Sequence, residues 1–131
     1  MQVVIVNYES AWRLEAELFK YAPDFIVCDE SSKIKNPQAK QARALHKLGA
    51  AARFKAILTG TPITNSPLCF FSQYKFVDSG IFGNSFYSFR TRYATMGGYG
   101  NKQVMGYKNL PELVTNAHSI AFRIRIEDAV D

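Results

Sequence analysis

The sequence lacks long apolar runs and has little cysteine. No run among its 131 residues approaches the length of a membrane span. Its first ten residues lack the basic end and long apolar core of a signal peptide. The two cysteines, Cys28 and Cys69, stand in apolar surroundings without metal-type spacing. We therefore expect no membrane segment, and reduced, buried thiols in a cytoplasmic protein.

Acidic residues are scarce through the middle of the chain. The net charge is +5, and the only acid between Glu30 and Glu112 is Asp78. The same stretch carries Lys33, Lys35, Lys40, Arg43, Lys47, Arg53, Lys55, Lys75, Arg90, Arg92, Lys102 and Lys108. Such an excess favours a polyanionic partner. A solvated basic surface explains the charge equally well on its own.

Apolar residues are plentiful, and their spacing predicts alternating strands and helices. They make up 47% of the chain, enough for the core of one domain. β-Branched or apolar runs predict strands, buried on both faces, over 2–7, 25–28 and 55–58. Helical spacing predicts helices over 10–21, 36–48 and 66–77, capped by Ser10, Asn36 and Ser66, with Gly49 ending the second. This order indicates an α/β fold with a parallel sheet flanked by helices.

The later part of the chain has a different composition. Residues 81–93 are rich in aromatic side chains, which we expect mostly in a core, and residues 96–107 are rich in glycine. The glycine-rich stretch predicts a loop or small hairpin, where Tyr99 and Tyr107 are candidates for exposed contacts. A helix over 110–117, capped by Asn109, and a last strand over 119–124 should follow.

Two adjacent carboxylates end the strand predicted over 25–28. Asp29 and Glu30 would lie at the carboxyl edge of the sheet, where open α/β folds bind ligands. One carboxylate there can hold Mg²⁺ through water, and its neighbour can activate a water molecule for attack on a phosphate. Taken alone the pair is a weak signal, since a solvated strand end is more common.

A second motif ends the next predicted strand. Thr59-Gly60-Thr61-Pro62 combines two hydroxyl groups with a glycine that permits a sharp turn. A right-handed crossover between parallel strands brings both strand ends to one edge. We therefore expect this turn to lie beside Asp29 and Glu30, which makes the two motifs together far more specific than either alone.

Several segments carry recognisable signatures in succession: Val4–Glu9, Asp29–Ser32, Ile34–Pro37, Leu58–Ile63 with Asn65, Phe76-Val77 and Ile81–Gly83. Together they resemble the Swi/Snf-type branch of superfamily-two helicases and DNA translocases. The resemblance implies that residues 1–131 form the latter part of a RecA-like (P-loop NTPase) motor lobe. Its core motifs would span 3–78, an insertion 81–108, and a closing helix and strand 109–126.

The resemblance also implies roles for particular residues. The family binds ATP and Mg²⁺ in a cleft and couples hydrolysis to movement on duplex DNA. Asp29 matches the magnesium-holding acid and Glu30 the acid that activates water. Thr59, Gly60 and Thr61 match the motif that couples nucleotide state to DNA contact. The DNA-contacting positions would be Asn7, Tyr8, Lys33, Lys35 and Asn36, with a second motor lobe as partner.

The chain departs from the family pattern in three places. Ser31 and Ser32 stand where the family usually has Ala-His, and Thr64 stands where many members have Gln. No G-x-x-x-x-G-K-S/T phosphate loop occurs in the sequence. We therefore expect that the chain alone neither binds ATP tightly nor hydrolyses it, and that the parent is of bacterial or phage type.

Two other functions fit the same residues. The chain could be a non-catalytic DNA-binding or docking module that keeps a motor fold. It could also be a folded piece with no activity of its own. Because an open sheet edge invites pairing between chains, we expect some self-association in either case.

Overall fold

The computed structural model of the chain describes residues 1–60 and 66–123. It divides into two compact units, Met1–Arg90 and Thr91–Asp131. No helix of the described residues is both long and apolar enough to span a membrane.

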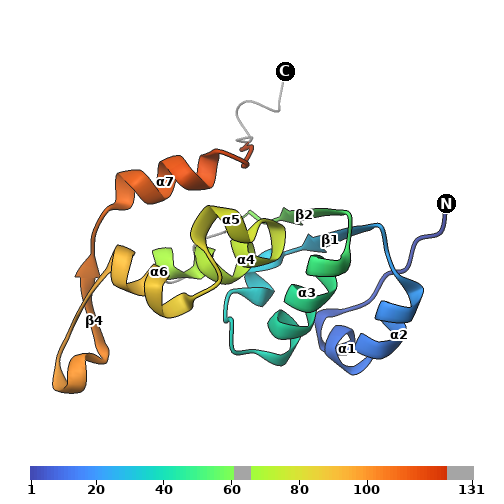
Figure 1. Ribbon diagram of the computed structural model, residues 1–131, viewed down its shortest axis with the longest axis horizontal. Helices are drawn as coiled ribbons and strands as arrows, with labels where there is room; N and C mark the ends of the chain where they lie inside the picture. The colour runs from blue at the N-terminus through green and yellow to red at the C-terminus, as the bar shows by residue number, and fades with distance from the viewer. Residues whose placement is uncertain (61–65, 124–131) are drawn as a thin grey trace. The chain divides into compact units, whose positions relative to one another are not determined.

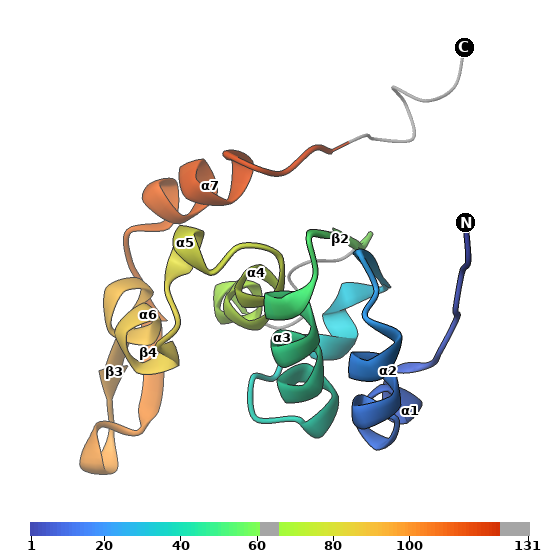
Figure 2. The same ribbon diagram turned by 45° about the vertical axis from the view of Figure 1, so that its right-hand side comes forward.

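A parallel pair of strands forms the centre of the first unit. Strand β1 (Phe25–Asp29) pairs with β2 (Phe54–Leu58), with Phe25 opposite Phe54 and Asp29 opposite Leu58. Helix α3 (Lys40–Ala51) connects them and lies below both strands in Figure 1 and below β2 in Figure 2. The predicted parallel sheet with flanking helices is therefore confirmed for these two strands.

The first predicted strand is not formed. Residues 2–7 have no strand partner among the described residues, and Val3, Val4, Ile5 and Val6 are exposed. A short β-branched run becomes a strand only when a neighbour satisfies its backbone groups, and propensity does not replace that neighbour.

Two short helices stand where one was predicted. Helix α1 (Tyr8–Arg13) is capped by Asn7, whose side chain accepts a hydrogen bond from the Ser10 amide at 2.7 Å, so the predicted Ser10 cap is wrong. Helix α2 (Glu15–Tyr21) follows after a break at Leu14. It ends at Ala22, which has left-handed backbone angles.

Helix α3 begins later and ends later than predicted. The Asn36 side chain accepts a bond from the Gln38 amide at 2.9 Å, which closes a turn instead of capping the helix. The helix then begins at Lys40 and runs through the predicted stop at Gly49. A Cβ at Gly49 would lie 2.8 Å from the Phe76 ring, so glycine is present here for close packing.

One hydrophobic core holds the first unit together. Its buried members are Cys28, Ile34, Ala42, Leu45, Leu48 and Phe76. Ile26 and Ile57 add to it from the strands. The opposite face of the sheet carries Phe25, Val27, Phe54 and Leu58, which are all exposed. The prediction that these strands are buried on both faces is thus wrong, because the helices of this unit pack on one face only.

The aromatic residues join the rest of the first unit. The 3₁₀ turn η2 (Pro67–Cys69), capped by Ser66, leads into α4 (Phe70–Val77), α5 (Ser79–Phe82) and α6 (Phe86–Tyr93). Ring pairs 5.1–5.4 Å apart link Phe71, Tyr74, Phe82, Phe86 and Phe89. The prediction that most of these aromatics form a core is confirmed.

The second unit contains a hairpin and a helix. Strands β3 (Ala94–Gly97) and β4 (Gln103–Tyr107) pair antiparallel around the turn η3 (Tyr99–Asn101), which confirms the predicted hairpin. Helix α7 (Leu110–His118) follows, and Glu112 accepts two bonds from Arg92 at 2.6 and 2.8 Å. Residues 119–123 form no strand, so the predicted last strand is wrong there; Ile124 lies outside the described residues.

Candidate functional site

The two acids lie at the carboxyl end of β1. Asp29 is opposite Leu58, and Glu30 and Thr59 are the residues that directly follow these two strand ends. The carboxyl ends of the two strands therefore meet at one edge of the sheet, as the sequence predicts. Thr61 and Pro62, the rest of that turn, lie outside the described residues.

The backbone turns sharply at the acid pair. Glu30 has φ 51° and ψ 55°, a left-handed conformation that costs free energy for a residue with a side chain. The Asp29 carboxylate accepts a hydrogen bond from the Glu30 amide at 3.0 Å. Both side chains are exposed. Two exposed neighbouring carboxylates are thus available at this strand end for two separate roles.

Tyr8 supports the end of β1 from helix α1. Its hydroxyl donates a hydrogen bond to the Asp29 carbonyl. Burial, followed by the neighbouring Cys28, raises the pKa of Tyr8 above its ordinary value. Burial also raises the pKa of the Cys28 thiol to about 12. Both groups are therefore neutral near pH 7, and both cysteines are buried, as predicted.

The loop after the acids is tied to helix α4 by a contact that the sequence reading missed. The Ser31 hydroxyl donates to Gln73 Oε1 at 2.7 Å. Beside it, His46 Nε2 lies 2.9 Å from the Ser72 carbonyl oxygen and 3.2 Å from its hydroxyl. The signal was present in the sequence, since Ser72 and Gln73 are uncharged polar residues among the aromatic residues of α4.

Magnesium fits this edge of the sheet by donor chemistry. Asp29 and Glu30 supply hard carboxylate oxygens, the ligands that Mg²⁺ prefers. The described residues hold no cluster of three His, Cys, Asp or Glu side chains that could hold a metal ion. A Mg²⁺ ion that shares one or two carboxylates with waters and substrate phosphates needs no such cluster.

The predicted DNA-contacting residues lie in two places. Lys33, Lys35 and Asn36 come together in and just after the 3₁₀ turn η1 (Ser31–Ile34), directly behind the acid pair. Asn7 and Tyr8 lie at the start of α1, where Asn7 caps the helix and Tyr8 reaches Asp29. Their role in DNA contact stays a prediction.

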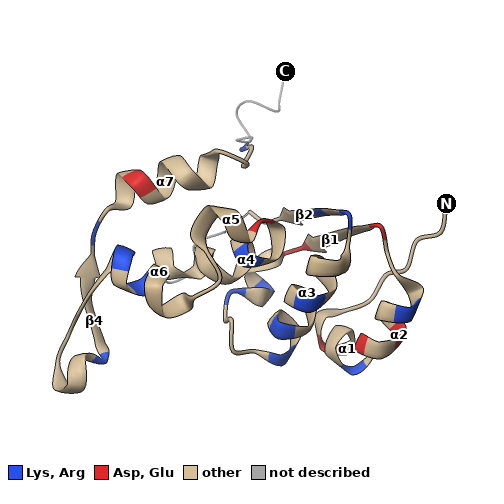
Figure 3. Cartoon of the chain, in the orientation of Figure 1, with Lys and Arg blue, Asp and Glu red and all other residues tan. Residues whose placement is uncertain are grey.

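Two basic side chains of α3 make contacts within the first unit. Lys40 Nζ lies 4.6 Å from the centre of the Trp12 ring, and Lys47 Nζ lies 3.5 Å from Glu15 Oε1. Figure 3 shows the basic positions of α3 and of the preceding loop. These contacts favour a structural role for Lys40 and Lys47, and leave the loop as the better candidate for phosphate contact.

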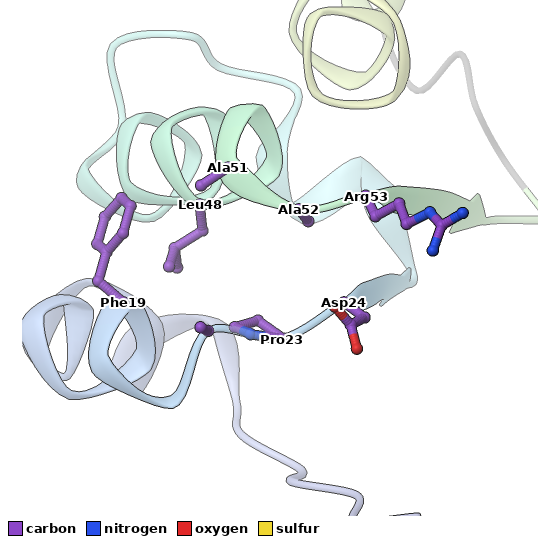
Figure 4. A pocket seen from close by; sticks show the side chains of 8 residues that line it. Phe19, Pro23, Asp24, Leu48, Ala51, Ala52 and Arg53 are labelled. Carbon is purple, nitrogen blue, oxygen red and sulfur yellow. The ribbon is translucent and has the colours of Figure 1, made fainter.

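A pocket of about 260 Å³ lies at the other end of the strands (Figure 4). Its lining includes Asp24 and Arg53, which immediately precede β1 and β2. The remaining lining residues are Phe19, Ala22, Pro23, Leu48, Ala51 and Ala52. The pocket is therefore apart from the carboxyl edge that carries the acids.

A sequence model described as SNF2-related domain matches residues 1–121. The chain belongs to this family. The Swi/Snf-type resemblance of the acid-pair and Thr-Gly-Thr-Pro motifs is thereby confirmed. The SNF2-related match also runs past the strong motifs and through the hairpin and helix α7.

Relatives of this SNF2-related chain include proteins of DNA repair and recombination. RDH54 of Saccharomyces cerevisiae is 40% identical over 94 residues, which cover 70% of this chain and 10% of the yeast protein. RAD54-like protein of Gallus gallus is 38% identical over 84 residues, 63% of this chain and 11% of its own length. RAD54 of Oryza sativa is 36% identical over 95 residues, which cover 71% of this chain and 9% of the rice protein. The chain thus spans about a tenth of the curated relatives it matches.

Proposed function

We propose that this chain is part of a RecA-like motor lobe that hydrolyses ATP to drive movement on duplex DNA. The observation that carries the proposal is the parallel register of β1 and β2, which brings the strand ends at Asp29 and Leu58 to one edge of the sheet. The membership of the SNF2-related family supports it. A second motor lobe of the parent protein would complete the cleft.

The acids have separate tasks in this proposal. Asp29 holds Mg²⁺ through water, and Glu30 orients and deprotonates the attacking water. Bound ATP would supply the phosphoryl group that the water accepts. Thr59, Gly60 and Thr61 link the nucleotide side of the sheet edge to the DNA side. The exposure of both carboxylates at the end of β1 supports this division.

DNA contact is assigned to the loop behind the acids and to the start of α1. Lys33 is exposed beside Asn36, and no acidic residue occurs in the sequence between Glu30 and Asp78. Phosphate contacts of this kind would be independent of DNA sequence and sensitive to salt. Lys35, Asn7 and Tyr8 complete the proposed contact.

Hydrolysis by the longer protein that carries this chain tests the acid assignment. Replacing a general base costs about 10²–10⁴ in rate, so Glu30→Gln should lower DNA-stimulated phosphate release by that factor. Glu17→Gln, on the exposed side of α2, is the matched control and should leave the rate unchanged. A rate that survives Glu30→Gln would remove Glu30 from catalysis.

The 131-residue chain tests whether this part is active alone, and the longer protein separates the proposal from a non-catalytic module. Since its sequence holds no phosphate loop, we expect no ATP hydrolysis by the isolated chain. DNA-stimulated phosphate release that Glu30→Gln abolishes would contradict this. If the longer protein also binds DNA in a salt-dependent way with no effect of nucleotide, the docking-module function is the correct one. The cytoplasmic setting and the bacterial or phage origin stay predictions.

A further inference from the structure

Two fully buried polar side chains join the acid-pair loop to helix α4. Ser31 and Gln73 each have 0% of their surface exposed, and the Ser31 hydroxyl donates to Gln73 Oε1 at 2.7 Å. A buried polar group without a partner costs free energy, so each of these side chains depends on the other. The contact joins positions that are 42 residues apart in the sequence.

The other end of the Gln73 amide fixes its orientation. Gln73 Nε2 donates to the Cys69 carbonyl at 3.0 Å. Because the amide nitrogen is committed to that carbonyl, the amide oxygen faces Ser31. Cys69 is the last residue of the turn η2. One side chain therefore connects the loop behind the acids with the turn that begins α4.

Ser31 is the residue directly after Glu30. It opens the turn η1, whose N-cap is Glu30 in its left-handed conformation. The Lys33 amide donates to the Glu30 carbonyl at 3.0 Å, which closes the same turn. Holding Ser31 in place therefore limits the directions in which the Glu30 side chain can point.

We propose that Gln73 is a positioning residue, which holds the Glu30 loop in register with α4 through the buried hydroxyl of Ser31. The loop and the start of α4 then move as one piece. In this proposal Gln73 takes no part in the chemistry itself and acts on the Glu30 loop through Ser31. The functional part of this inference rests on the proposed function, whereas the ordering of the loop can be measured without it.

The neighbouring residue offers a matched comparison. Ser72 is also fully buried on α4, but its side chain meets His46 on α3 instead of the acid-pair loop. Loss of the Ser72 hydroxyl should therefore weaken the same helix without loosening the residues around Glu30.

Amide hydrogen exchange of the 131-residue chain, resolved at Lys33 and Lys35, tests the proposal. Both amides donate within the turn, to Glu30 and Ser32 respectively. Gln73→Leu should speed their exchange at least about tenfold, the loss of roughly one buried hydrogen bond. Ser72→Ala should leave their exchange within about twofold of the wild-type rate. If Gln73→Leu does not fold, Ser31→Ala removes the same hydrogen bond and should speed the exchange of the same two amides.

The double variant Ser31→Ala/Gln73→Leu separates positioning from simple packing. Replacing both polar partners by apolar groups can restore stability, so the Tm should recover toward the wild-type value. The exchange at Lys33 and Lys35 should remain fast, because the hydrogen bond between Ser31 and Gln73 is absent from the double variant. If exchange recovers together with the Tm, or never changes in Gln73→Leu, the proposal is wrong.

A second measurement on the longer protein joins this contact to catalysis. Gln73→Leu should lower kcat for DNA-stimulated ATP hydrolysis about tenfold, with KM for ATP changed less than about twofold. Ser72→Ala should change neither value. An unchanged kcat despite a loosened loop would overturn the positioning role. A protein with no ATPase activity in any form would instead contradict the proposed function and leave the exchange result standing.

Discussion

The two faces of the β1–β2 sheet carry similar side chains but have different surroundings. On one face, Cys28 and Ile57 pack with Leu45, Leu48 and Phe76 in the core. On the other, Phe25, Val27, Phe54 and Leu58 are exposed. Since apolar residues run almost without interruption along both strands, the sequence alone suggests two equal faces.

The difference shows that helices, and not strand composition, decide which face is buried. Helices α3 and α4 contribute Leu45, Leu48 and Phe76 to one side only. The acids follow β1 at the end of this one-sided sheet. Stability should therefore depend strongly on one face and association between chains on the other.

The largest effect on stability should come from replacing one phenylalanine by alanine on the buried side of the sheet, compared with the same replacement on the exposed face. Phe76 is 1% exposed and Phe54 is 55% exposed. Phe76→Ala should lower the free energy of unfolding by about 3–5 kcal/mol through lost burial and a cavity. Phe54→Ala should cost less than about 1 kcal/mol. Urea unfolding followed by circular dichroism measures both, and similar losses would contradict the one-sided core.

Gly49 provides a finer test of packing on the covered face. An alanine Cβ there would lie 2.8 Å from the ring of buried Phe76. Overpacking costs about 1–3 kcal/mol, whereas glycine to alanine in a helix gains up to about 1 kcal/mol. We expect Gly49→Ala to lower the free energy of unfolding by about 1–2 kcal/mol.

A second substitution shows whether the Phe76 ring causes that loss. Gly49→Ala should cost less in a Phe76→Leu background than in the wild-type chain, because the two sites share one contact. If Gly49→Ala instead stabilises the chain, helix propensity has outweighed packing and Gly49 is not a packing glycine.

Much of the first unit could be predicted from spacing along the sequence. The strands β1 and β2, their parallel pairing and the meeting of the acids with Thr59 follow from apolar runs and a crossover helix. Missed features depend on contacts distant in sequence. Gly49 is typical of a helix end in the sequence, but in the structure it packs against Phe76. Residues 2–7 are typical of a strand, but they have no strand partner among the described residues.

The same distinction applies to the site. Asp29 and Glu30 stand out because two acids end an apolar run. Ser31 and Gln73 are separated by 42 positions, and neither residue type by itself indicates a contact. Only the uncharged polar residues at positions 72 and 73, among the aromatic residues of α4, could have signalled a buried network.

Lowering the pH should reduce the free energy of unfolding through His46, by less than the substitutions above. Burial, with help from the charge of Lys75, lowers the pKa of His46 below 6.5, although its hydrogen bond to Ser72 opposes this. The folded state therefore favours the neutral ring. This contribution is fully present above about pH 6.5 and is lost as pH falls toward the lowered pKa.

The thermal midpoint measured between pH 7 and pH 5 tests this sign. Wild type should lose stability over that interval, and His46→Gln should lose less because it removes the titrating ring. His118→Gln, on exposed positions of α7, should keep the wild-type slope. A slope that is unchanged in His46→Gln would show that other groups set the acid sensitivity.

The smallest effect on stability, and the clearest on association, should come from charges on the exposed face. Val27→Lys combined with Phe54→Lys places two like charges on a surface that is already open to water. The free energy of unfolding should change by less than about 1 kcal/mol per site, the span of strand preferences. Self-association, followed by sedimentation across a concentration series, should weaken because the apolar face and unpaired strand edges no longer attract another copy.

Ala16→Lys combined with Ala50→Lys adds the same charge on exposed helix positions and should leave association largely intact. A wild-type chain that stays strictly monomeric at high concentration, or equal weakening by both pairs, would show that the exposed face does not bind a second chain.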